Sequence, residues 1–579
     1  MNKTFKYNDM ITDDKLNPFV PNFLLGTAGG LIYRKLKRVS RNPRKASEKT
    51  LRAILNYAKD SVYGKEHHFA DILKAKSDEE LYRLYAENVK PNEYEDFRPY
   101  VERHKHGEAD VLFPGKPVLY ATTSGATSEP KWIPITKEYI DNVYGKMNKV
   151  WLYNFIMNRK KVYEGPIVSI VGKVIEGYAP DGTMYGSVSG YTQTSCPNFV
   201  KKLYASPQGV FRIEDYTARN YAIMRMGIER NVHLVVTANP STMVEMQNNV
   251  NRYLDEYITD IENGTIRSQF GNYTIPEDIL NEIRPYLKPN HERAQELRDL
   301  KAKYDVVLPK YFWPELQLLT TWKCGNTKVY LEKLENCYPE GMLHQEFGYF
   351  SSECRFGLVL DDSINTVLFP HYHYYEFVSE DDFGSPDAKF LQLHELVPGK
   401  RYCPYVTTWA GLYRYNMNDI IEVSDFFEKT PRVHMIQKVN GIVTMTGEKL
   451  YEPQFIEAVR NAEKETGMKT RFFIGFAELK TSTYHFYYEF ENQETTMEQA
   501  EEFTKTVDAN LKKSNIEYEA KRDSFRLKDP VAHLLQDNSF EKFKEESLRI
   551  SGADASRFKL NILLQDETRH ERMKLFEKK

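Results

Sequence analysis

A short apolar run passes directly into a loop of small hydroxyl residues and glycine. The run is Pro117–Ala121 (PVLYA), and the loop is Thr122–Lys131 (TTSGATSEPK). A buried strand that ends in such a loop can wrap a triphosphate, because backbone N–H groups and hydroxyls donate to the phosphate oxygens and a lysine supplies counter-charge. The loop is not the GxxxxGK[ST] phosphate loop, since Trp132 follows Lys131 and the glycine spacing differs. Taken alone, it is equally well explained as an ordinary Ser/Thr/Gly turn.

Apolar runs and helical stretches alternate along the chain. Pro166–Val171 (PIVSIV) predicts a second buried strand, and a helix capped by Ser47 is expected before both strands. Asp215–Arg230 and Glu277–Lys303 have the apolar spacing typical of helices. Alternation of this kind predicts an α/β architecture, in which helices cover the faces of sheets. The segment Asp260–Lys303 is more charged than its flanks and is expected to form an exposed helical insertion.

The pattern changes at Gln437–Gly441 (QKVNG), where a compact tail begins. In that tail Tyr484–Phe490 (YHFYYEF) alternates like a half-buried strand. The sequence therefore predicts a large domain of residues 1–437 and a small domain of residues 438–579.

Composition excludes several classes of protein. A net charge of -3 gives no general attraction to nucleic acid or to anionic membranes. Five cysteines without a CxxC pair argue against a disulfide scaffold or a structural zinc site and favour a reducing compartment. The run Phe23–Tyr33 (FLLGTAGGLIY) is too short to span a bilayer and follows Asp13 and Asp14, where a signal peptide would be positively charged. We therefore expect a cytoplasmic protein with no nucleic-acid or membrane partner.

Four further motifs suit a nucleotide site when they occur together. Tyr349–Glu353 (YFSSE) ends in a carboxylate that can hold Mg2+ against phosphate, and it begins with an aromatic residue that can stack on a base. Gly411–Asp419 (GLYRYNMND) places an aspartate where it can accept from both ribose hydroxyls. A solvated glutamate and a turn aspartate are the commoner interpretations of each motif alone. Gly447–Leu450 (GEKL) and Ser551–Lys559 (SGADASRFK) follow, and the order of all the motifs carries the argument.

Together these motifs resemble the adenylate-forming superfamily, and more closely the auxin-responsive promoter (Gretchen Hagen) family of acyl acid–amido synthetases. TTSGATSEPK, YFSSECRFG, VTTWAGLYRYNMNDI and TGEKLYE follow the order of that family's pattern, and the resemblance runs from about Phe19 to Lys559. It implies an α/β, firefly luciferase-like fold. A large N-terminal domain with sheets and a distorted barrel would be capped by a small, mobile C-terminal α+β domain.

The resemblance also implies roles for individual residues. Glu353 would be the Mg2+-linked carboxylate, and Lys559 would swing over the α-phosphate; these two are the expected catalytic residues. Asn416 and Asn418 stand where the plant pattern has arginine and glycine, and asparagine can take the left-handed conformation that glycine allows. Lys438 would be the hinge. The implied ATP-site residues are Thr123, Ser124, Gly125, Thr127, Tyr349, Ser352, Asp419 and Lys438.

The activity implied is ATP- and Mg2+-dependent ligation. A small carboxylic acid would be activated as its acyl-adenylate and passed to an amino acid or another amine. An acyl-CoA synthetase that shares the same ATP site, and a non-catalytic nucleotide-binding protein, are the alternatives. The acyl acid is expected between Val174 and Pro240 and near Leu318–Trp322. The sequence names neither the acid, nor the amine, nor the oligomeric state.

Overall fold

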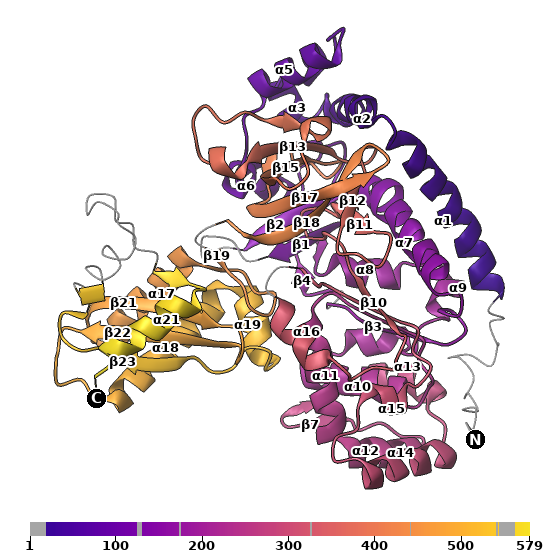
Figure 1. The fold of residues 1–579 in the computed structure, drawn as a ribbon, viewed down its shortest axis with the longest axis vertical. Coiled ribbons are helices and arrows are strands. Elements are labelled where there is room, and N and C mark those ends of the chain that lie inside the picture. The colour runs from indigo at the N-terminus through magenta and orange to yellow at the C-terminus, as the bar shows by residue number, and fades with distance from the viewer. Residues whose placement is uncertain are drawn as a thin grey trace. The chain divides into compact units, whose positions relative to one another are not determined.

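The fold is that of a computed structural model in which the chain separates into two compact units (Figure 1). The first unit comprises Met1–Thr122 and Trp132–Gln437, and the second comprises Thr123–Lys131 and Lys438–Lys579. The structure describes residues 19–123, 130–172, 175–324, 327–439, 442–539, 542–543 and 562–578.

The strand that carries the hydroxyl-rich loop lies in a small sheet of order β2-β1-β5-β4. β1 pairs in parallel with β5, with Tyr120 opposite Tyr185. The predicted strand at Pro117–Ala121 is confirmed, although β1 begins and ends two residues later. The strands of this sheet are β1 (Leu119–Thr123), β2 (Lys131–Ile135), β4 (Gly177–Tyr178) and β5 (Met184–Tyr185).

A parallel sheet of order β10-β9-β6-β3 forms the second layer of the first unit. Parallel strands are buried on both faces, which agrees with the apolar run predicted at Pro166–Val171. The predicted helix between β3 and β6 is α10 (Tyr216–Ile228), and it begins where the side chain of Asp215 accepts from the Ala218 N–H at 2.7 Å. The strands are β3 (Ile167–Ile170), β6 (Leu234–Thr237), β9 (Leu318–Thr321) and β10 (Leu343–Glu346).

The third sheet of the first unit contains antiparallel strand pairs: β11 with β12, β12 with β18, β13 with β14, and β15 with both β13 and β17. Its order is β11-β12-β18-β17-β15-β13-β14, with β16 paired to β15. It begins directly after the YFSSE motif and ends at Lys438. The strands are β11 (Gly357–Val359), β12 (Thr366–Leu368), β13 (Tyr374–Ser379), β14 (Leu391–Gln392), β15 (Arg401–Thr407), β16 (Tyr415–Asn416), β17 (Asp419–Phe427) and β18 (Thr430–Lys438).

Helices at the N-terminus cover this sheet (Figure 1). The prediction that Ser47 caps this helix is wrong: the N-cap of α2 is Asn42, whose side chain accepts from the Lys45 N–H at 3.1 Å. Pro43 can start a helix because it has no N–H to satisfy, so the helix starts earlier and Ser47 is buried inside it. These helices are α1 (Phe19–Val39), α2 (Pro43–Ala58), α3 (Val62–Glu66), α4 (Phe69–Ile72), α5 (Asp78–Asn88) and α6 (Tyr94–Lys105).

α1 lies along α7 (Gly145–Asn158), as Figure 1 shows. A Cβ at Gly29 would come within 2.2 Å of the Lys149 carbonyl oxygen and 2.4 Å of the Tyr153 Cβ. The two helices therefore touch backbone to backbone at this point. The run Phe23–Tyr33 is thus packed along one face, as expected, whereas Phe23, Leu24 and Leu31 on its other side are exposed. No helix in the described part of the chain is both long and apolar enough to cross a membrane.

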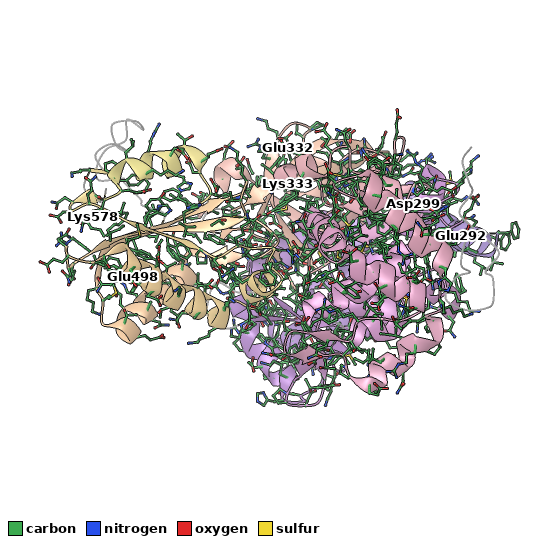
Figure 2. All side chains as sticks on the ribbon, turned by 90° about the horizontal axis from the view of Figure 1, so that it is seen from below. Glu292, Asp299, Glu332, Lys333, Glu498 and Lys578 are labelled. Carbon is green, nitrogen blue, oxygen red and sulfur yellow. The ribbon has the colours of Figure 1, made fainter. Side chains whose placement is uncertain are left out.

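The charged insertion, Asp260–Lys303, is largely helical, but two helices occur where one was predicted. Glu277–Lys303 forms α13 (Glu277–Ile283), a 3-10 turn and α14 (His291–Lys303), because the prolines at positions 285 and 289 remove backbone donors between them. Glu292 and Asp299 on α14, both labelled in Figure 2, are exposed, whereas Ala294 and Leu297 on the same helix are buried, so one face of this helix is exposed as expected. The other elements of the insertion are α12 (Leu254–Asn263), β7 (Gln269–Phe270) and β8 (Tyr273–Thr274).

Two hydrophobic cores fill the first unit. The larger core lies between the antiparallel sheet and the N-terminal helices, and the smaller one surrounds α10 and Trp313. Other helices of this unit are the π-helical turn η1 (Tyr139–Tyr144), α8 (Val188–Thr194), α9 (Asn198–Lys201), α11 (Pro240–Arg252), α15 (Pro309–Phe312) and α16 (Lys328–Leu334).

The second unit is an α+β layer built on a sheet of order β23-β22-β21-β24. One face packs Phe473 and Phe486 against α17 and α18, and the other packs Tyr487 against α21. β22 was predicted to be half-buried, which is wrong, because α21 covers its second face. The elements are β19 (Ile442–Val443), β20 (Leu450–Tyr451), α17 (Glu452–Thr466), β21 (Thr470–Glu478), β22 (Thr483–Phe490), α18 (Met497–Ser514), α19 (Ile516–Asp523), β23 (Val531–Leu534), β24 (Leu563–Leu564) and α21 (Glu567–Met573).

Candidate active site

A tight hairpin follows β10 and carries the YFSSE motif. Gly348 starts it with a φ of +97°, a conformation that residues with a side chain rarely adopt. Phe350 and Arg355 then face each other as an antiparallel bridge. Ser352 and Glu353 lie between these two residues, so the bridge fixes the turn that presents them.

Tyr349 joins this hairpin to the start of β17. Its hydroxyl donates a hydrogen bond to Oδ2 of Asp419, and its ring packs on Phe356 with the ring centroids 4.5 Å apart. Its backbone N–H donates to the Thr366 hydroxyl at 3.2 Å. Burial, followed by the negative charge of Asp419, raises the pKa of Tyr349 well above its usual value, so the phenol remains a donor at neutral pH. Two motifs that lie far apart in the sequence therefore meet at one carboxylate.

A glutamate that no sequence pattern singled out supports the loop before Asp419. The carboxylate of Glu93, the N-cap of α6, accepts from the side-chain amide of Asn416 at 2.7 Å and from that of Asn418 at 2.9 Å. The Asn418 N–H also donates to Asn416 Oδ1 at 2.9 Å. Asn418 has a φ of +53°, the left-handed conformation expected for this position. The two asparagines thus hold the turn that aims Asp419.

A buried ion pair anchors the same loop from its other side. Arg414 Nε lies 2.9 Å from Glu376 Oε2, and both side chains are almost fully buried. Arg414 Nη1 also donates to the Val89 carbonyl at 2.8 Å, which ties the loop to the end of α5. The sequence offered one signal for this pair, a glutamate within the otherwise apolar strand YYEFV.

Glu353 is a carboxylate with only 6% of its surface exposed. The pKa of the neighbouring Cys354 thiol lies well above its usual value. Burial is the largest cause, and the negative charges of Glu353 and then Asp419 add to it. Both carboxylates also raise the pKa of Tyr349, so they act on the same two neighbours. The half-buried hydroxyl of Ser352 precedes Glu353.

The donor atoms at the hairpin tip are oxygens. In the described part of the chain, no group of three or more His, Cys, Asp or Glu side chains could hold a metal ion. One carboxylate and one hydroxyl nevertheless fit Mg2+, which prefers oxygen ligands and usually completes its shell with water and substrate phosphates. Zinc and other metals that favour several His or Cys ligands do not suit this set.

The structure brings Tyr349, Glu353 and Asp419 together. Thr123 is buried at the end of β1, and Lys438 is half-buried at the end of β18. Their roles at the nucleotide stay predictions, as do those of Ser352, Glu353 and the adenine contact of Tyr349. The predicted residues that lie outside the described part of the chain are Ser124, Gly125, Thr127 and Lys559.

These layers define the class: the protein has the fold of adenylate-forming enzymes. The chain superposes on the acyl acid amido synthetase GH3.15 in complex with 2,4-DB with a TM-score of 0.63 and 19% identity, covering 98% of each chain. It also resembles 2-hydroxyisobutyryl-CoA ligase in complex with 2-HIB-AMP and CoA, with a TM-score of 0.50 and 12% identity, covering 92% of this chain and 91% of the ligase.

The chain belongs to the GH3 family. Residues 32–342, 366–438 and 453–568 match the N-terminal, central and C-terminal domains of that family. The chain is 24% identical over 558 residues to indole-3-acetic acid-amido synthetase GH3.4 of Arabidopsis thaliana, which covers 91% of this chain and 90% of the relative. The resemblance and the fold class predicted from the motifs are therefore confirmed.

Proposed function

We propose that the chain is an ATP-dependent acid–amino acid ligase. It converts a small carboxylic acid into its acyl-adenylate and then transfers the acyl group to the amine of an amino acid. The observation that carries the proposal is the meeting of Tyr349, Glu353 and Asp419 around one hairpin. Membership of a family whose relatives are named amido synthetases supports the amide as product.

Activation is needed because a free carboxylate is a poor acyl donor, whose leaving group would be oxide. In the first step a carboxylate oxygen attacks the α-phosphorus of ATP. A new O–P bond forms, the bond to the β-phosphate oxygen breaks, and pyrophosphate departs. The obstacle is electrostatic, since an anion must approach a polyanion, so the site has to supply positive charge and oriented donors.

Asp419 suits the ribose. Its carboxylate can accept from sugar hydroxyls while Tyr349 holds Oδ2 in place. Glu353 and Ser352 would hold Mg2+ at the triphosphate, where the ion would neutralise charge on the phosphate oxygens. Thr123 would donate to those oxygens at the end of β1, and the phosphate contacts expected of Ser124, Gly125 and Thr127 belong to the same proposal. Tyr349 would lie beside the adenosine.

The second step replaces AMP by an amine. The nitrogen attacks the acyl carbon, the C–O bond to AMP breaks, and the amine proton passes to solvent. Lys559 would supply positive charge in the first step only. The division at Lys438 into an ATP- and acyl-binding domain and a mobile C-terminal domain belongs to this proposal. So does a cytoplasmic location, which the free cysteines Cys196, Cys324, Cys337, Cys354 and Cys403 support.

Exchange of labelled pyrophosphate into ATP tests the first step. A panel of aryl, indolyl and aliphatic acids should include at least one that supports exchange in the presence of Mg2+. Mass spectrometry with each amino acid, and separately with coenzyme A, then identifies the acceptor. An acyl-CoA without amide would establish the thioester alternative, and cleavage of ATP to ADP would show an acyl-phosphate route instead of an adenylate.

A further inference from the structure

Glu346 is a buried carboxylate just before the YFSSE hairpin. It is the last residue of β10, and only 2% of its surface is exposed. Its Oε1 accepts from the Gly348 N–H at 2.9 Å, and its Oε2 accepts from the Lys323 N–H. The two oxygens of one side chain therefore join the start of the hairpin to the segment that follows β9.

Both polar backbone groups of Gly348 are held by side chains. Glu346 accepts from its N–H, and Nε1 of Trp322 donates to its carbonyl oxygen at 3.1 Å. The ladder between β9 and β10 ends just before it, where the Phe347 N–H donates to the Thr321 carbonyl at 2.9 Å. With a φ of +97°, Gly348 does not continue the strand. Side chains thus replace the ladder at the residue that starts the hairpin.

The segment after β9 is itself fixed to the parallel sheet. The Trp322 N–H donates to the Ala238 carbonyl at 2.7 Å, and the indole lies edge-on to Phe347 with the ring centroids 6.1 Å apart. Nζ of Lys323 donates to the His344 carbonyl at 3.0 Å. Because it is attached at several points, this segment can serve as the support to which Glu346 fastens the hairpin.

A buried charge at the end of a strand is costly, and strand pairing does not require it. Burial raises the pKa of Glu346, whereas the N–H groups of Gly348 and Lys323 lower it, as does the neighbouring thiol of Cys324. Two converging N–H groups need two acceptor oxygens, and an amide side chain offers only one. Departures from local rules of this kind concentrate at functional sites.

The conformation of Gly348 determines where the next residue points. Tyr349 follows it directly, and the phenol donates to the carboxylate of Asp419. A rotation about the backbone of Gly348 would carry the phenol away from that carboxylate. Ser352 and Glu353 belong to the same hairpin and would move with it. The contacts of Glu346 therefore reach the nucleotide side of the candidate site through one peptide group.

We propose that Glu346 is a positioning residue for ATP: by fastening Gly348 to the segment after β9, it sets the hairpin that carries Tyr349. Glu346 itself touches neither substrate nor metal. The proposal rests on the proposed function, because that function assigns the hairpin to the nucleotide. The acyl acid is expected near Leu318–Trp322, so the same contacts connect the acid side of the site to its ATP side.

Hydrogen exchange of the full-length protein without ligand tests the contact itself. Glu346→Gln keeps the size of the side chain but puts an NH2 group where one backbone donor needs an acceptor. The amides of residues 347–354 should therefore exchange about tenfold faster. The matched control is Asp260→Asn, which alters a buried carboxylate of the insertion that accepts from the Arg267 N–H at 2.7 Å. It should leave these amides unchanged, and equal exchange in Glu346→Gln and wild type overturns the proposal.

Calorimetric titration with Mg2+ and α,β-methylene-ATP tests the consequence for the nucleotide. Glu346→Gln and Trp322→Phe should each weaken binding about tenfold, because each releases one side of the Gly348 peptide group. The double variant should bind nearly as well as the weaker single variant, since both side chains act through the same group. Losses that multiply in the double variant contradict the proposal, as do affinities within about twofold of wild type in both single variants.

Kinetics and melting temperatures separate positioning from a merely structural role. A structural residue would lower the melting temperature and kcat together and leave KM for ATP unchanged. We expect Glu346→Gln to raise KM for ATP, whereas Asp260→Asn should keep the KM of wild type even if it melts as early. A lower kcat with an unchanged KM in Glu346→Gln means that the proposal is wrong.

The proposed function can fail separately from this proposal. Absence of pyrophosphate exchange with every acid would contradict the proposed function alone, because hydrogen exchange and binding of the ATP analogue need no acid. Failure of the wild-type protein to bind the analogue would overturn both.

Discussion

The hydroxyl of Tyr349 donates to the carboxylate of Asp419, and both side chains are buried. The aspartate expected to bind ribose is thus already oriented before any nucleotide arrives. One oxygen is engaged by the phenol, and the backbone leading to the carboxylate is held through Asn416 and Asn418 by Glu93. A preorganised acceptor of this kind lowers the entropy that a ligand must lose on binding.

Removing that hydroxyl should weaken ATP binding more than it slows chemistry. We expect Tyr349→Phe to raise KM for ATP about tenfold, which corresponds to about 1.4 kcal/mol for a lost hydrogen bond to a charged group. The value of kcat should change little, because ribose contacts serve ground state and transition state alike. Initial-rate kinetics at saturating acid measure both constants. An unchanged KM would show that Tyr349 does not orient Asp419 for the nucleotide.

The two carboxylates should respond differently to substitution. Glu353→Gln keeps the shape but loses the charge, so adenylation should fall by roughly 100-fold or more, and the Mg2+ concentration for half-maximal rate should rise. Asp419→Ala should chiefly raise KM for ATP. Glu332→Gln, at an exposed glutamate of α16 labelled in Figure 2, is the control and should behave as wild type. Identical kinetics in all three variants would remove both assignments.

Lys559 is expected to act in one half-reaction only. Its charge is needed while a carboxylate approaches phosphorus, but not while a neutral amine attacks the finished adenylate. Lys559→Ala should therefore slow adenylation by raising its activation free energy by several kcal/mol, roughly the effect of losing an electrostatic contact to developing charge. Aminolysis of a chemically synthesised acyl-adenylate should proceed nearly as in wild type. Equal slowing of both half-reactions contradicts domain alternation.

The buried pair Arg414–Glu376 should dominate the stability of the loop before β17. We expect Glu376→Ala to lower the free energy of unfolding by about 3–5 kcal/mol, because it leaves a buried charge without its partner. Glu422→Ala is the matched control. It breaks the exposed contact of Arg401 at 3.3 Å, which contributes about 0–1 kcal/mol.

Urea unfolding followed by tryptophan fluorescence measures this difference in the first unit alone. All five tryptophans lie in that unit, at Trp132, Trp151, Trp313, Trp322 and Trp409. Equal losses for the two variants would contradict the buried-pair argument.

The second unit should lose stability as the pH falls. Burial lowers the pKa of His533 to about 3 and that of His570 to about 4, and His485 shifts in the same direction. The unfolded chain, with histidine pKa near 6.5, therefore binds more protons than the folded chain below that pH. The contribution of these neutral histidines to the free energy of unfolding is therefore fully present above a pH of about 6.5. It is lost progressively as the pH falls toward about 4. Glu478 and Glu577 lessen the effect by facing His485 and His533.

Hydrogen exchange of peptides from β22 and β23, corrected for intrinsic rates, measures that loss. The free energy of opening should fall as the pH is lowered from 7 to 5. His533→Gln should reduce the slope of this free energy against pH. An equal slope in the variant and in wild type would show that groups other than His533 cause the pH dependence.

Local patterns in the sequence predicted much of the fold. The strand before the hydroxyl-rich loop, the strand at Pro166–Val171 and the helix after Asp215 all occur, because burial period and capping residues are local signals. The prediction of one helix over Glu277–Lys303 was wrong because prolines interrupt it. The prediction that one face of β22 is exposed was wrong because no local pattern shows that α21 covers this face.

The site shows the same limit. YFSSE and GLYRYNMND could be recognised as motifs, but the contact between Tyr349 and Asp419 joins them across the fold. Glu93 lies more than three hundred residues before the asparagines that it holds, so no spacing rule connects them.

The close contact at Gly29 fixes the spacing between α1 and α7. α7 touches α1 backbone to backbone through Lys149 and Tyr153, while Asn148 and Trp151 on the same helix face Arg355. α7 cannot shift toward α1, because even a methyl group at position 29 would collide with it. Sequence change in this part of the protein must therefore exchange other side chains and keep Gly29 intact, so a library randomised along both helices should return glycine at position 29 among its folded members.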